Sequence, residues 1–503
     1  MTTALGTRAV RGSLWLGVVN LVSKSSQMLV TLVLAALLTE GQLGAVALAV
    51  ALVNLGQVVQ SIGVYDVIGR TARDPRRTAG TVLTLSVGAG LVLAVALVAA
   101  AGPLTALLGT PDAAGLVRLA ALGLPFSAAG GVQMGLMHRE LDFRRRLLPD
   151  GGSAVLGAAL TVVLAACGAG PLSLVLGLLA TAVSQPLLGA LARGGVRPCW
   201  DTAAAREVLR WVAVVGPAAV VGALLVNVDY FAVGHVLGPD AVGVYSLAYR
   251  LAWVPYIMVA VVLGAVAFPV FTRLRREGTP LGGAVTRFTR AVLVVTAGLY
   301  LALAVLADHV VLLGTRWAAA AAPLVLLSGY GVGICLLQIW YQAVKATGHV
   351  RRYLALETTH LALLAAGLVA LTHAGIGTVA LVQCAAAWLV VPLAWRVLAG
   401  LGVAPSPAEL GGMVVRVALA CAAGAVPAVL LGRWFGATLP GVLAEAAVLV
   451  AGYAGATVLL QRTALAELRR GGLREPAQPT TAVLAHPQRP PMKSVHPHRG
   501  GRP

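Results

Sequence analysis

The sequence predicts an all-α polytopic membrane protein with about 14 transmembrane helices, and three observations support this prediction. Of its 503 residues, 59% are hydrophobic and only 11% are charged. Apolar runs of roughly 20 residues, the length that crosses a bilayer, recur from one end of the chain to the other. Lysine and arginine collect in alternate loops, as the positive-inside rule requires of a multi-pass chain. These features exclude a water-soluble globular fold.

The apolar runs are bounded by glycine, proline and charged clusters. We expect helices near residues 12–38, 43–64, 79–101, 114–137, 149–168, 171–192, 208–233, 241–271, 284–306, 318–344, 354–372, 376–399, 411–432 and 438–461. The first run follows Arg8 and Arg11 and is longer than the core of a signal peptide. It is therefore predicted to be a retained first span.

The distribution of cations predicts the topology. Most of the 37 lysines and arginines lie at the N-terminus, in each even-to-odd connection or in the C-terminal tail, with the helix ends beside them. The exceptions are Lys24, Arg118, Arg250, Arg316 and Arg433. Both termini should therefore lie in the cytoplasm, with the chain in the cytoplasmic (inner) membrane. The net charge of +19 has this topological explanation, and no nucleic-acid partner is expected because no basic patch lies on a soluble domain.

Internal similarity indicates a duplication. The stretch "LLTEGQLGAVALAVAL" (37–52) aligns with "VLGPDAVGVYSLAYRL" (236–251) at an offset of 199 residues. Two further pairs, 107–122 with 312–327 and "FRRRLL" with "VRRYLA", follow in the same order at offsets of 205 to 207. Six helices separate the copies, so both should have the same orientation and be related by an axis along the membrane normal.

The duplication predicts four regions of the chain. An N-terminal six-helix lobe (1–200) and a C-terminal six-helix lobe (201–400) should surround a central cavity. Residues 401–462 would form two extra helices, 13 and 14. Residues 463–503 are rich in proline and arginine and predict a disordered basic cytoplasmic tail that contacts anionic membrane lipid.

Two stretches carry a resemblance to a known family. The pattern is a helix, then "LLTxxxLG" or "LGxxxxGxYSLAYRL", then a helix that ends in "FPVFTRL". It resembles bacterial oligosaccharide flippases, the polysaccharide-transporter branch of the multidrug/oligosaccharidyl-lipid/polysaccharide exporter superfamily. The resemblance extends to about residue 400. It implies two six-helix lobes, a cavity lined chiefly by helices 1, 2, 7 and 8, alternating access, and polyprenyl-diphosphate-linked sugars as substrates.

Polar side chains inside the first two spans are candidates for the cavity. In helix 1, polar residues recur at helical spacing: Asn20, Ser23, Lys24, Gln27 and Thr31. In helix 2, Asn54, Gln57 and Ser61 repeat the pattern. A stripe of this kind is costly against lipid, so both faces should turn to each other or to a wet cavity. Lys24 either binds substrate or has a structural role, bonded to helix-end carbonyls or to a neighbour.

Helices 7 and 8 carry the other candidates. Tyr245, Tyr249, Trp253 and Tyr256 form an aromatic row that either stacks on sugar faces or packs as an interfacial belt. Asp229 and Arg250 lie at similar depth, about ten residues on either side of the turn near Pro239, and should form an ion pair. This pair either satisfies two buried charges or acts as a switch that releases Arg250 to a diphosphate.

The sequence thus predicts a flippase that translocates a lipid-linked (polyprenyl-diphosphate) oligosaccharide for cell-surface polysaccharide or lipopolysaccharide biosynthesis. The predicted substrate-binding residues are Lys24, Arg250, Gln27, Asn54, Gln57, Tyr249 and Trp253, with Asp229 as coupling or switch residue. Polysaccharide-assembly proteins are further expected partners. No Walker motif appears, and five scattered cysteines lack paired spacing, so no cofactor, metal or direct use of ATP is predicted.

Two other functions are weighed against this one. An ion-coupled exporter of small drugs or metabolites on the same architecture would need coupling carboxylates deep in the cavity, for which Asp229 is the candidate. A membrane glycosyltransferase or polymerase would need a sizeable outer domain with catalytic carboxylates. The longest outer loop, near residues 102–113, holds a single acid, Asp112, so an enzyme is not expected.

Overall fold

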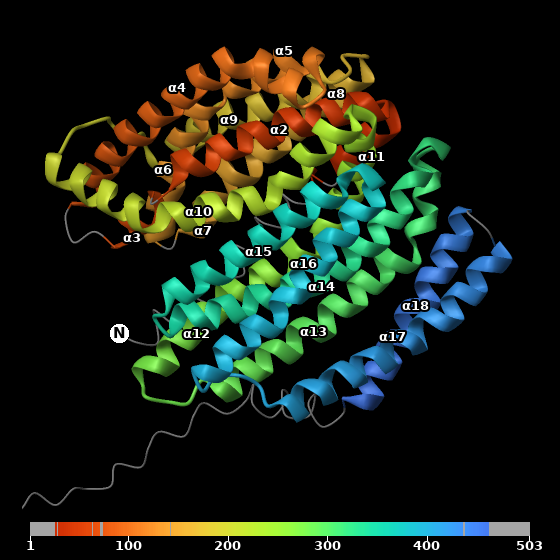
Figure 1. Ribbon diagram of the computed structural model, residues 1–503. Helices are drawn as coiled ribbons and strands as arrows, with labels where there is room; N and C mark the ends of the chain where they lie inside the picture. The colour runs from red at the N-terminus through yellow and green to blue at the C-terminus, as the bar shows by residue number, and fades with distance from the viewer. Residues whose placement is uncertain are drawn as a thin grey trace, which may run out of the picture.

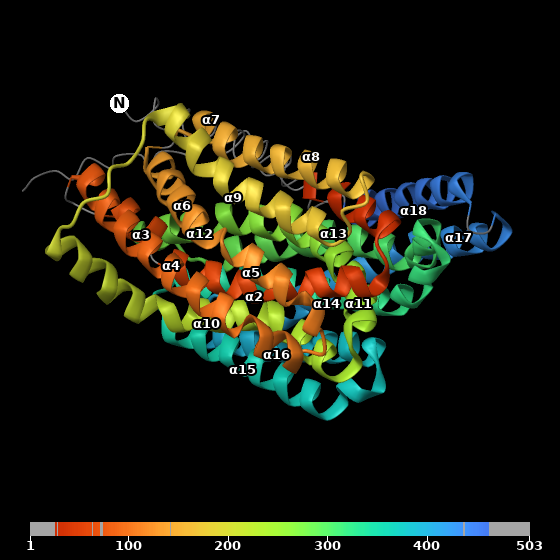
Figure 2. The ribbon, with the colours of Figure 1, turned by 90° about the horizontal axis from the view of Figure 1, so that it is seen from above.

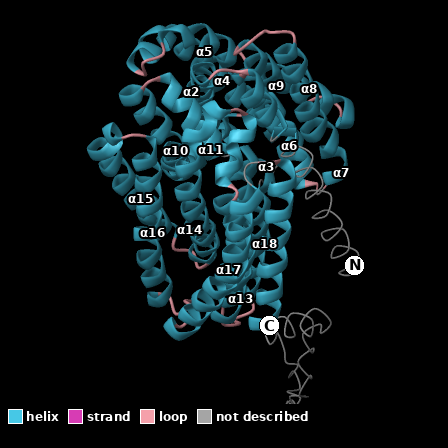
Figure 3. Cartoon of the chain, turned by 90° about the vertical axis from the view of Figure 1, so that its right-hand side faces the viewer, coloured by secondary structure: helices cyan, strands magenta, loops and turns pink. Residues whose placement is uncertain are grey.

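The computed structural model describes residues 26–27, 29–62, 64–70, 74–140, 142–435 and 438–461. Within these ranges the chain is helical and has no strand (Figure 3). The helices in order are α2 (Glu40–Ser61), α3 (Val64–Arg70), α4 (Pro75–Leu107), η1 (Pro111–Ala113), α5 (Ala114–Ala121), α6 (Leu124–Arg139), α7 (Phe143–Arg146), η2 (Leu147–Gly152), α8 (Ser153–Ala166), α9 (Leu172–Arg193), α10 (Thr202–Leu237), α11 (Pro239–Pro255), η3 (Tyr256–Val261), α12 (Val262–Arg276), α13 (Gly282–Val305), η4 (Ala307–Leu313), η5 (Thr315–Ala320), α14 (Ala321–Ala346), α15 (Val350–Leu371), η6 (Thr372–Ala374), α16 (Ile376–Gly400), α17 (Pro407–Phe435) and α18 (Leu439–Leu460).

These elements confirm an all-α multi-pass membrane architecture. Twelve helices of the described chain are long and apolar enough to cross a membrane, and a bent pair, Pro111–Ala121 with Leu124–Arg139, makes up to 13. The bent pair coincides with the span predicted near 114–137. The first predicted span, 12–38, lies largely outside the described residues, so the total of 14 stays a prediction. The C-terminal tail, 463–503, also lies outside them.

Local chemistry explains where the cavity helices begin. Thr39 caps α2, since its hydroxyl accepts from the Gln42 amide at 3.3 Å while the Gln42 side chain accepts from the Thr39 amide at 3.2 Å. Asp201 accepts from the first amides of α10, at 2.8 Å from that of Ala203. Gly238, with φ of 85°, then turns the chain between α10 and α11.

Proline distorts the helix that carries the predicted aromatic row. Pro255 ends α11, and the next six residues, Tyr256–Val261, form the π-helical turn η3 before α12 continues to Arg276. Proline has no N–H to donate to the preceding turn, which favours such a local widening. The side chains after Pro255 are therefore rotated about the helix axis relative to their directions in a regular α-helix.

Most helices of the first half of the chain lie together, and α11 packs against α2. Figure 1 shows α4 to α9 (orange to yellow) in the upper part of the view and α12 to α16 (green to cyan) below them. Viewed from above, α2 and α11 lie in the middle of the bundle, and α17 and α18 lie at its edge (Figure 2). This pair contacts α13, where the Tyr453 hydroxyl donates to the Val294 carbonyl at 2.5 Å, and α18 also contacts η4 through Glu445 and His309.

The arginine-rich connections interact with one another. The Arg139 guanidinium donates to the Ile68 carbonyl at 2.6 Å, and Arg193 forms an ion pair with Glu140. In the second half, Arg275 donates to the Ala346 carbonyl at 2.8 Å. Each contact joins two loops that the cation distribution predicts to be cytoplasmic. The division into two lobes and the cytoplasmic placement of both termini stay predictions.

Candidate functional site

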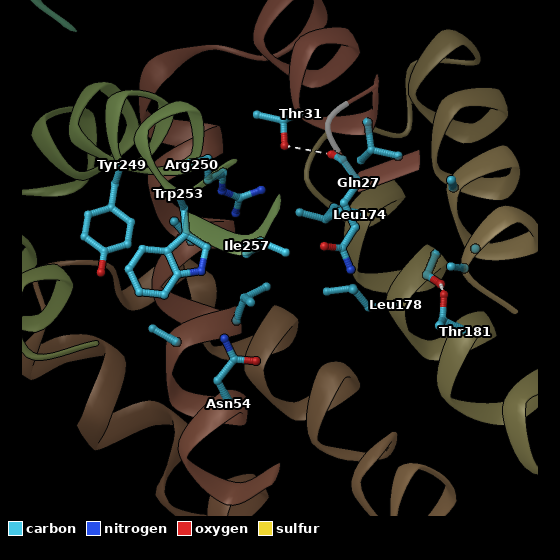
Figure 4. A pocket seen from close by; sticks show the side chains of 18 of the residues that line it. Gln27, Thr31, Asn54, Leu174, Leu178, Thr181, Tyr249, Arg250, Trp253 and Ile257 are labelled. Atoms are coloured by element: carbon cyan, nitrogen blue, oxygen red, sulfur yellow. Dashed lines mark hydrogen bonds between the residues drawn. The ribbon is translucent and has the colours of Figure 1, made fainter. Parts of the chain in front are cut away.

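A cavity of about 610 Å³ lies between the two halves of the chain. Its lining comes from the end of the first predicted span, from α2, α8 and α9 on one side, and from α10, α11, η3 and α12 on the other. Cavities of this size suit small ligands or one part of a larger ligand. Polar and aromatic side chains point into it from several helices (Figure 4).

Six of the eight predicted site residues line this cavity: Gln27, Asn54, Gln57, Tyr249, Arg250 and Trp253. In Figure 4 the amides of Gln27 and Asn54 and the guanidinium of Arg250 point toward the same open space. Lys24, with its neighbours Asn20 and Ser23, lies outside the described residues. The structure thus brings the described part of the first stripe, Gln27 and Thr31, to one cavity with Asn54, Gln57 and the helix 8 group, and it leaves their role in substrate binding as a prediction.

Arg250 gives the cavity its electrostatic character. It is the one charged side chain among the described residues that line the cavity. Its guanidinium lies near the hydroxyl of Tyr230, a neutral neighbour on α10. A cation whose charge no lining carboxylate neutralises attracts anions, and an arginine fork suits phosphate oxygens in particular.

Asp229 is held elsewhere, and the predicted ion pair with Arg250 is wrong. The carboxylate is fully buried and accepts hydrogen bonds from the Tyr245 hydroxyl at 2.8 Å and the Gln383 amide at 2.9 Å. Its other oxygen accepts from the Tyr230 backbone N–H at 2.9 Å. These three donors, from α10, α11 and α16, stabilise the Asp229 carboxylate in place of the Arg250 guanidinium.

The helical period explains this correction. Tyr245 and Arg250 are five residues apart on α11, which places them about 140° apart around the helix axis. Tyr245 faces Asp229, so Arg250 turns toward the cavity. Two charges predicted at similar depth on neighbouring helices need not face each other, because depth does not set the rotation of a helix about its axis.

The aromatic residues of α11 and η3 form a continuous row. Ring centroids lie 5.9 Å apart for Tyr245 and Tyr249, 5.5 Å for Tyr249 and Trp253, and 4.5 Å for Trp253 and Tyr256. Tyr249 and Trp253 are stacked, with 19° between their planes, and both line the cavity. The row therefore runs from the buried Asp229 site along the cavity wall. Whether these rings stack on sugar faces or only pack against one another stays a prediction.

One wall of the cavity was not anticipated. Gly157 and Thr161 of α8 meet Gly177 and Thr181 of α9, and all four line the cavity. Each threonine hydroxyl donates to the carbonyl four residues before it at 2.9 Å and fills the space beside a glycine of the opposite helix. The repeated Gly-x-x-x-Thr spacing was the signal that would have marked this close helix pair.

The sequence comparisons identify relatives of this chain. Residues 33–322 match the family model described as polysaccharide biosynthesis protein. The succinoglycan biosynthesis transport protein ExoT of Rhizobium meliloti is 27% identical over 289 residues, 57% of this chain and 58% of ExoT. The lipopolysaccharide biosynthesis protein WzxC of Escherichia coli is 24% identical over 277 residues, 54% of this chain and 56% of WzxC. The alignments thus span little more than half of these curated relatives.

Solved structures show the same fold. The lipid II flippase MurJ, in an inward closed conformation, superposes with a TM-score of 0.73 at 12% identity over 91% of this chain and 100% of MurJ. An inward-facing multidrug resistance transporter of the MATE family gives a TM-score of 0.61 at 18% identity, over 77% of this chain and 99% of the transporter. At these identities the likeness shows the architecture alone.

Proposed function

The chain belongs to the polysaccharide biosynthesis protein family, and from this membership we propose that it is a flippase for a lipid-linked, polyprenyl-diphosphate oligosaccharide. It would move its substrate across the cytoplasmic membrane for the assembly of cell-surface polysaccharide. Lipid and polysaccharide-assembly proteins are its proposed partners. The transport and biosynthesis roles in the names of ExoT and WzxC support this assignment, and no catalytic activity is proposed.

One observation carries the proposal: the cavity between the halves holds an arginine that no lining carboxylate neutralises, next to stacked aromatic rings and carboxamides. In the proposed complex Arg250 contacts the diphosphate. Trp253 and Tyr249 contact apolar faces of sugar rings, as aromatic planes do well. The amides of Asn54 and Gln57 bond sugar hydroxyls, and Lys24 adds a second positive charge.

The size of the cavity limits what enters it. A volume of about 610 Å³ accommodates a diphosphate with a short saccharide, but not a long polyprenyl chain in addition. We therefore propose that the tail remains in lipid while the head group crosses. Alternating access of the two halves would move the head group, with each conformation exposing the cavity to one side of the membrane.

Asp229 is proposed as the coupling residue, in a revised form. It cannot act by holding Arg250 directly in the described conformation, because Tyr245, Gln383 and the Tyr230 amide already occupy its oxygens. Tyr245 is on the same helix as Arg250. Protonation or ion binding at Asp229 would thus act on Arg250 by altering the position of α11.

The experiment is reconstitution in vesicles with a fluorescent polyprenyl-diphosphate oligosaccharide and an impermeant quencher that reports leaflet exposure. Wild-type protein should accelerate exchange between leaflets, and Arg250→Ala should slow it. Rates in wild-type vesicles equal to those in protein-free vesicles would refute the flippase proposal. An exporter of small drugs would instead leave the fluorescent lipid in place and change drug resistance in cells upon deletion.

A further inference from the structure

Two glycines lie where α2 and α11 cross. Gly44 and Gly243 are both buried. A β-carbon added to Gly44 would overlap the carbonyl oxygen of Pro239, and one added to Gly243 would overlap the carbonyl oxygen of Glu40. The two helix backbones therefore touch with no side chain between them. We call these four residues the glycine crossing.

The crossing is reciprocal with respect to the internal repeat. The offset of 199 residues relates Gly44 to Gly243 and Glu40 to Pro239. Gly44 contacts Pro239, which lies four residues before Gly243. Gly243 contacts Glu40, which lies four residues before Gly44. A two-fold axis that passes through the contact gives this pattern, which is the symmetry that the predicted duplication requires.

Side chains from a distant loop fix the chain beside the crossing. The Arg316 guanidinium donates to the Ala35 carbonyl at 3.0 Å and to the Ala36 carbonyl at 2.9 Å, and the Trp317 indole N–H donates to the Ala35 carbonyl at 2.8 Å. The carbonyls at a helix end have no partner within the helix, so these donors cap the helix that ends at Leu37.

The equivalent segments of the other half also meet. The His235 ring nitrogen Nδ1 lies 2.6 Å from the Leu107 carbonyl oxygen, and a β-carbon on Gly109 would contact the Gly234 carbonyl. The offset of 199 relates 35–36 to 234–235, and the offset of 205 relates 107–109 to 312–314, just before Arg316. A loop of each half therefore holds a helix end of the other half, on both sides of the crossing.

The position of the crossing relates it to the cavity. The crossing lies near the ends of the loops that are predicted to be on the outer side. These loops contain residues 38–39, 107–113, 238 and 306–320. Gly44 precedes Ala47, the first cavity residue of α2, by three positions, or about 5 Å along the helix. The crossing thus closes the cavity at its predicted outer end.

We propose that the glycine crossing and the loop contacts on either side of it form the outer seal of the cavity, closed in this conformation and separated when the cavity opens outward. This inference rests on the alternating access of the proposed function. Closure requires the two backbones to touch, which a side chain prevents. A methyl group at Gly44 or Gly243 should therefore disfavour the closed seal and favour the outward-open state.

The test measures access to the cavity from outside. In a chain with its five cysteines replaced, a single cysteine at Val226, which lines the cavity, reacts with a membrane-impermeant maleimide in cells. Gly44→Ala and Gly243→Ala should each raise the labelling rate about fivefold or more, because overpacking a close contact disfavours that packing. Arg316→Gln, which adds no volume at the crossing, should raise it about threefold through loss of charge-assisted hydrogen bonds.

Gly222→Ala is the matched control. It lies within α10, where an added β-carbon meets no atom within 4 Å, and it shares the gain in helix propensity of the other two variants. Its labelling rate should equal that of the parent. Unchanged labelling in Gly44→Ala, Gly243→Ala and Arg316→Gln at normal abundance would overturn the proposal, as would an equal increase in Gly222→Ala.

A cross-link that holds the seal closed provides the converse test. A β-carbon at Gly41 would lie against the Asp240 carboxylate, so Gly41→Cys with Asp240→Cys should form a disulfide across the crossing upon oxidation. The bridged protein should resist outer labelling at position 226 until it is reduced. Labelling at the same rate in the bridged and reduced forms would overturn the proposal. Neither assay measures transport of the lipid-linked sugar, so failure of these assays and failure of the substrate assignment are distinguishable.

Discussion

The two walls of the cavity occupy equivalent places in the repeat but differ in chemistry. The offset of 199 residues relates three lining positions of each helix: Val50, Ala51 and Asn54 in α2, and Tyr249, Arg250 and Trp253 in α11. One wall has an apolar pair and an amide, whereas the other has two aromatic rings and a cation. At the crossing, by contrast, both helices have glycine. Contact between two backbones requires glycine at both positions, whereas the cavity walls accommodate side chains of different chemistry.

The helices that precede α2 and α11 in the chain also differ in their chemistry. Continuing the same offset relates Val30 of the first span to Asp229 of α10, and both are buried. The carboxylate, the aromatic row and the described cation of the site all belong to the second half. The first half supplies the amides of Asn54 and Gln57 and the small residues of the α8–α9 wall. We infer that, among the described residues, the α11 wall recognises charge and the α2 wall supplies neutral hydrogen bonds.

The largest effect is expected from Arg250. Arg250→Ala should lower export of surface polysaccharide by roughly 10- to 100-fold, since a hydrogen bond to a charged group contributes about 1.5–3 kcal/mol. Export is measured by surface staining at equal protein abundance. Adding Ala51→Arg to this variant places a cation at the equivalent position of the other wall. Partial recovery would show that the cavity needs a cation at this depth, and no recovery would tie the requirement to the α11 wall.

Normal export by Arg250→Ala would refute its role with the diphosphate. Arg118→Ala, on α5 and outside the cavity, serves as the control for the loss of one arginine. It should leave export unchanged.

Asp229→Asn should lower export about tenfold. The new amide nitrogen faces either the Tyr230 backbone N–H or the donors of Tyr245 and Gln383, which share one oxygen, so at least one buried donor loses its acceptor, at about 1–3 kcal/mol. Thermal stability in detergent should fall as well. Tyr245→Phe keeps the carboxylate and removes one bond, so it should lower stability while the dependence of export on pH or on the coupling ion remains. If Asp229→Asn preserved both export and this dependence, Asp229 would have no coupling role.

A smaller effect is expected from the aromatic row. Trp253→Ala should lower export about tenfold or less, because stacking contributes about 0.5–1.5 kcal/mol beyond burial. Trp253→Phe keeps an aromatic plane and should retain most of the export. Trp253→Asn copies the residue at the equivalent position 54 and should behave as the alanine variant does. Equal export by all three variants would leave the row with a packing role only.

The smallest effect is expected from the amide wall. Asn54→Ala should lower export about threefold, since a neutral hydrogen bond contributes about 0.5–1.5 kcal/mol. Asn54→Asp places a negative charge opposite the diphosphate site and should lower it further. The vesicle assay measures both rates. A loss with Asn54→Ala that equals the loss with Arg250→Ala would contradict the assignment of charge recognition to one wall.

The sequence alone determined the membrane-spanning architecture and much of the polar and aromatic lining of the cavity. Hydrophobic length and the positions of charged clusters are local properties, so the spans near 43–64 and 376–399 correspond to α2 and α16. The polar stripe of helix 2 predicted the placement of Asn54 and Gln57, because a buried polar side chain in a membrane must face a cavity or a partner. The four-residue spacing of Tyr249 and Trp253 likewise predicted that these two side chains lie on one face of their helix.

The tertiary structure decided which helices share those faces. Asp229 bonds to Gln383, 154 positions away, and nothing in the spacing of α10 and α11 indicates a donor from α16. The wall of Gly157 and Gly177 and the contact of Gly44 with Gly243 likewise depend on how closely two helices cross. Depth in the membrane follows from distance along one helix, whereas rotation and approach between helices depend on the packing of the whole bundle.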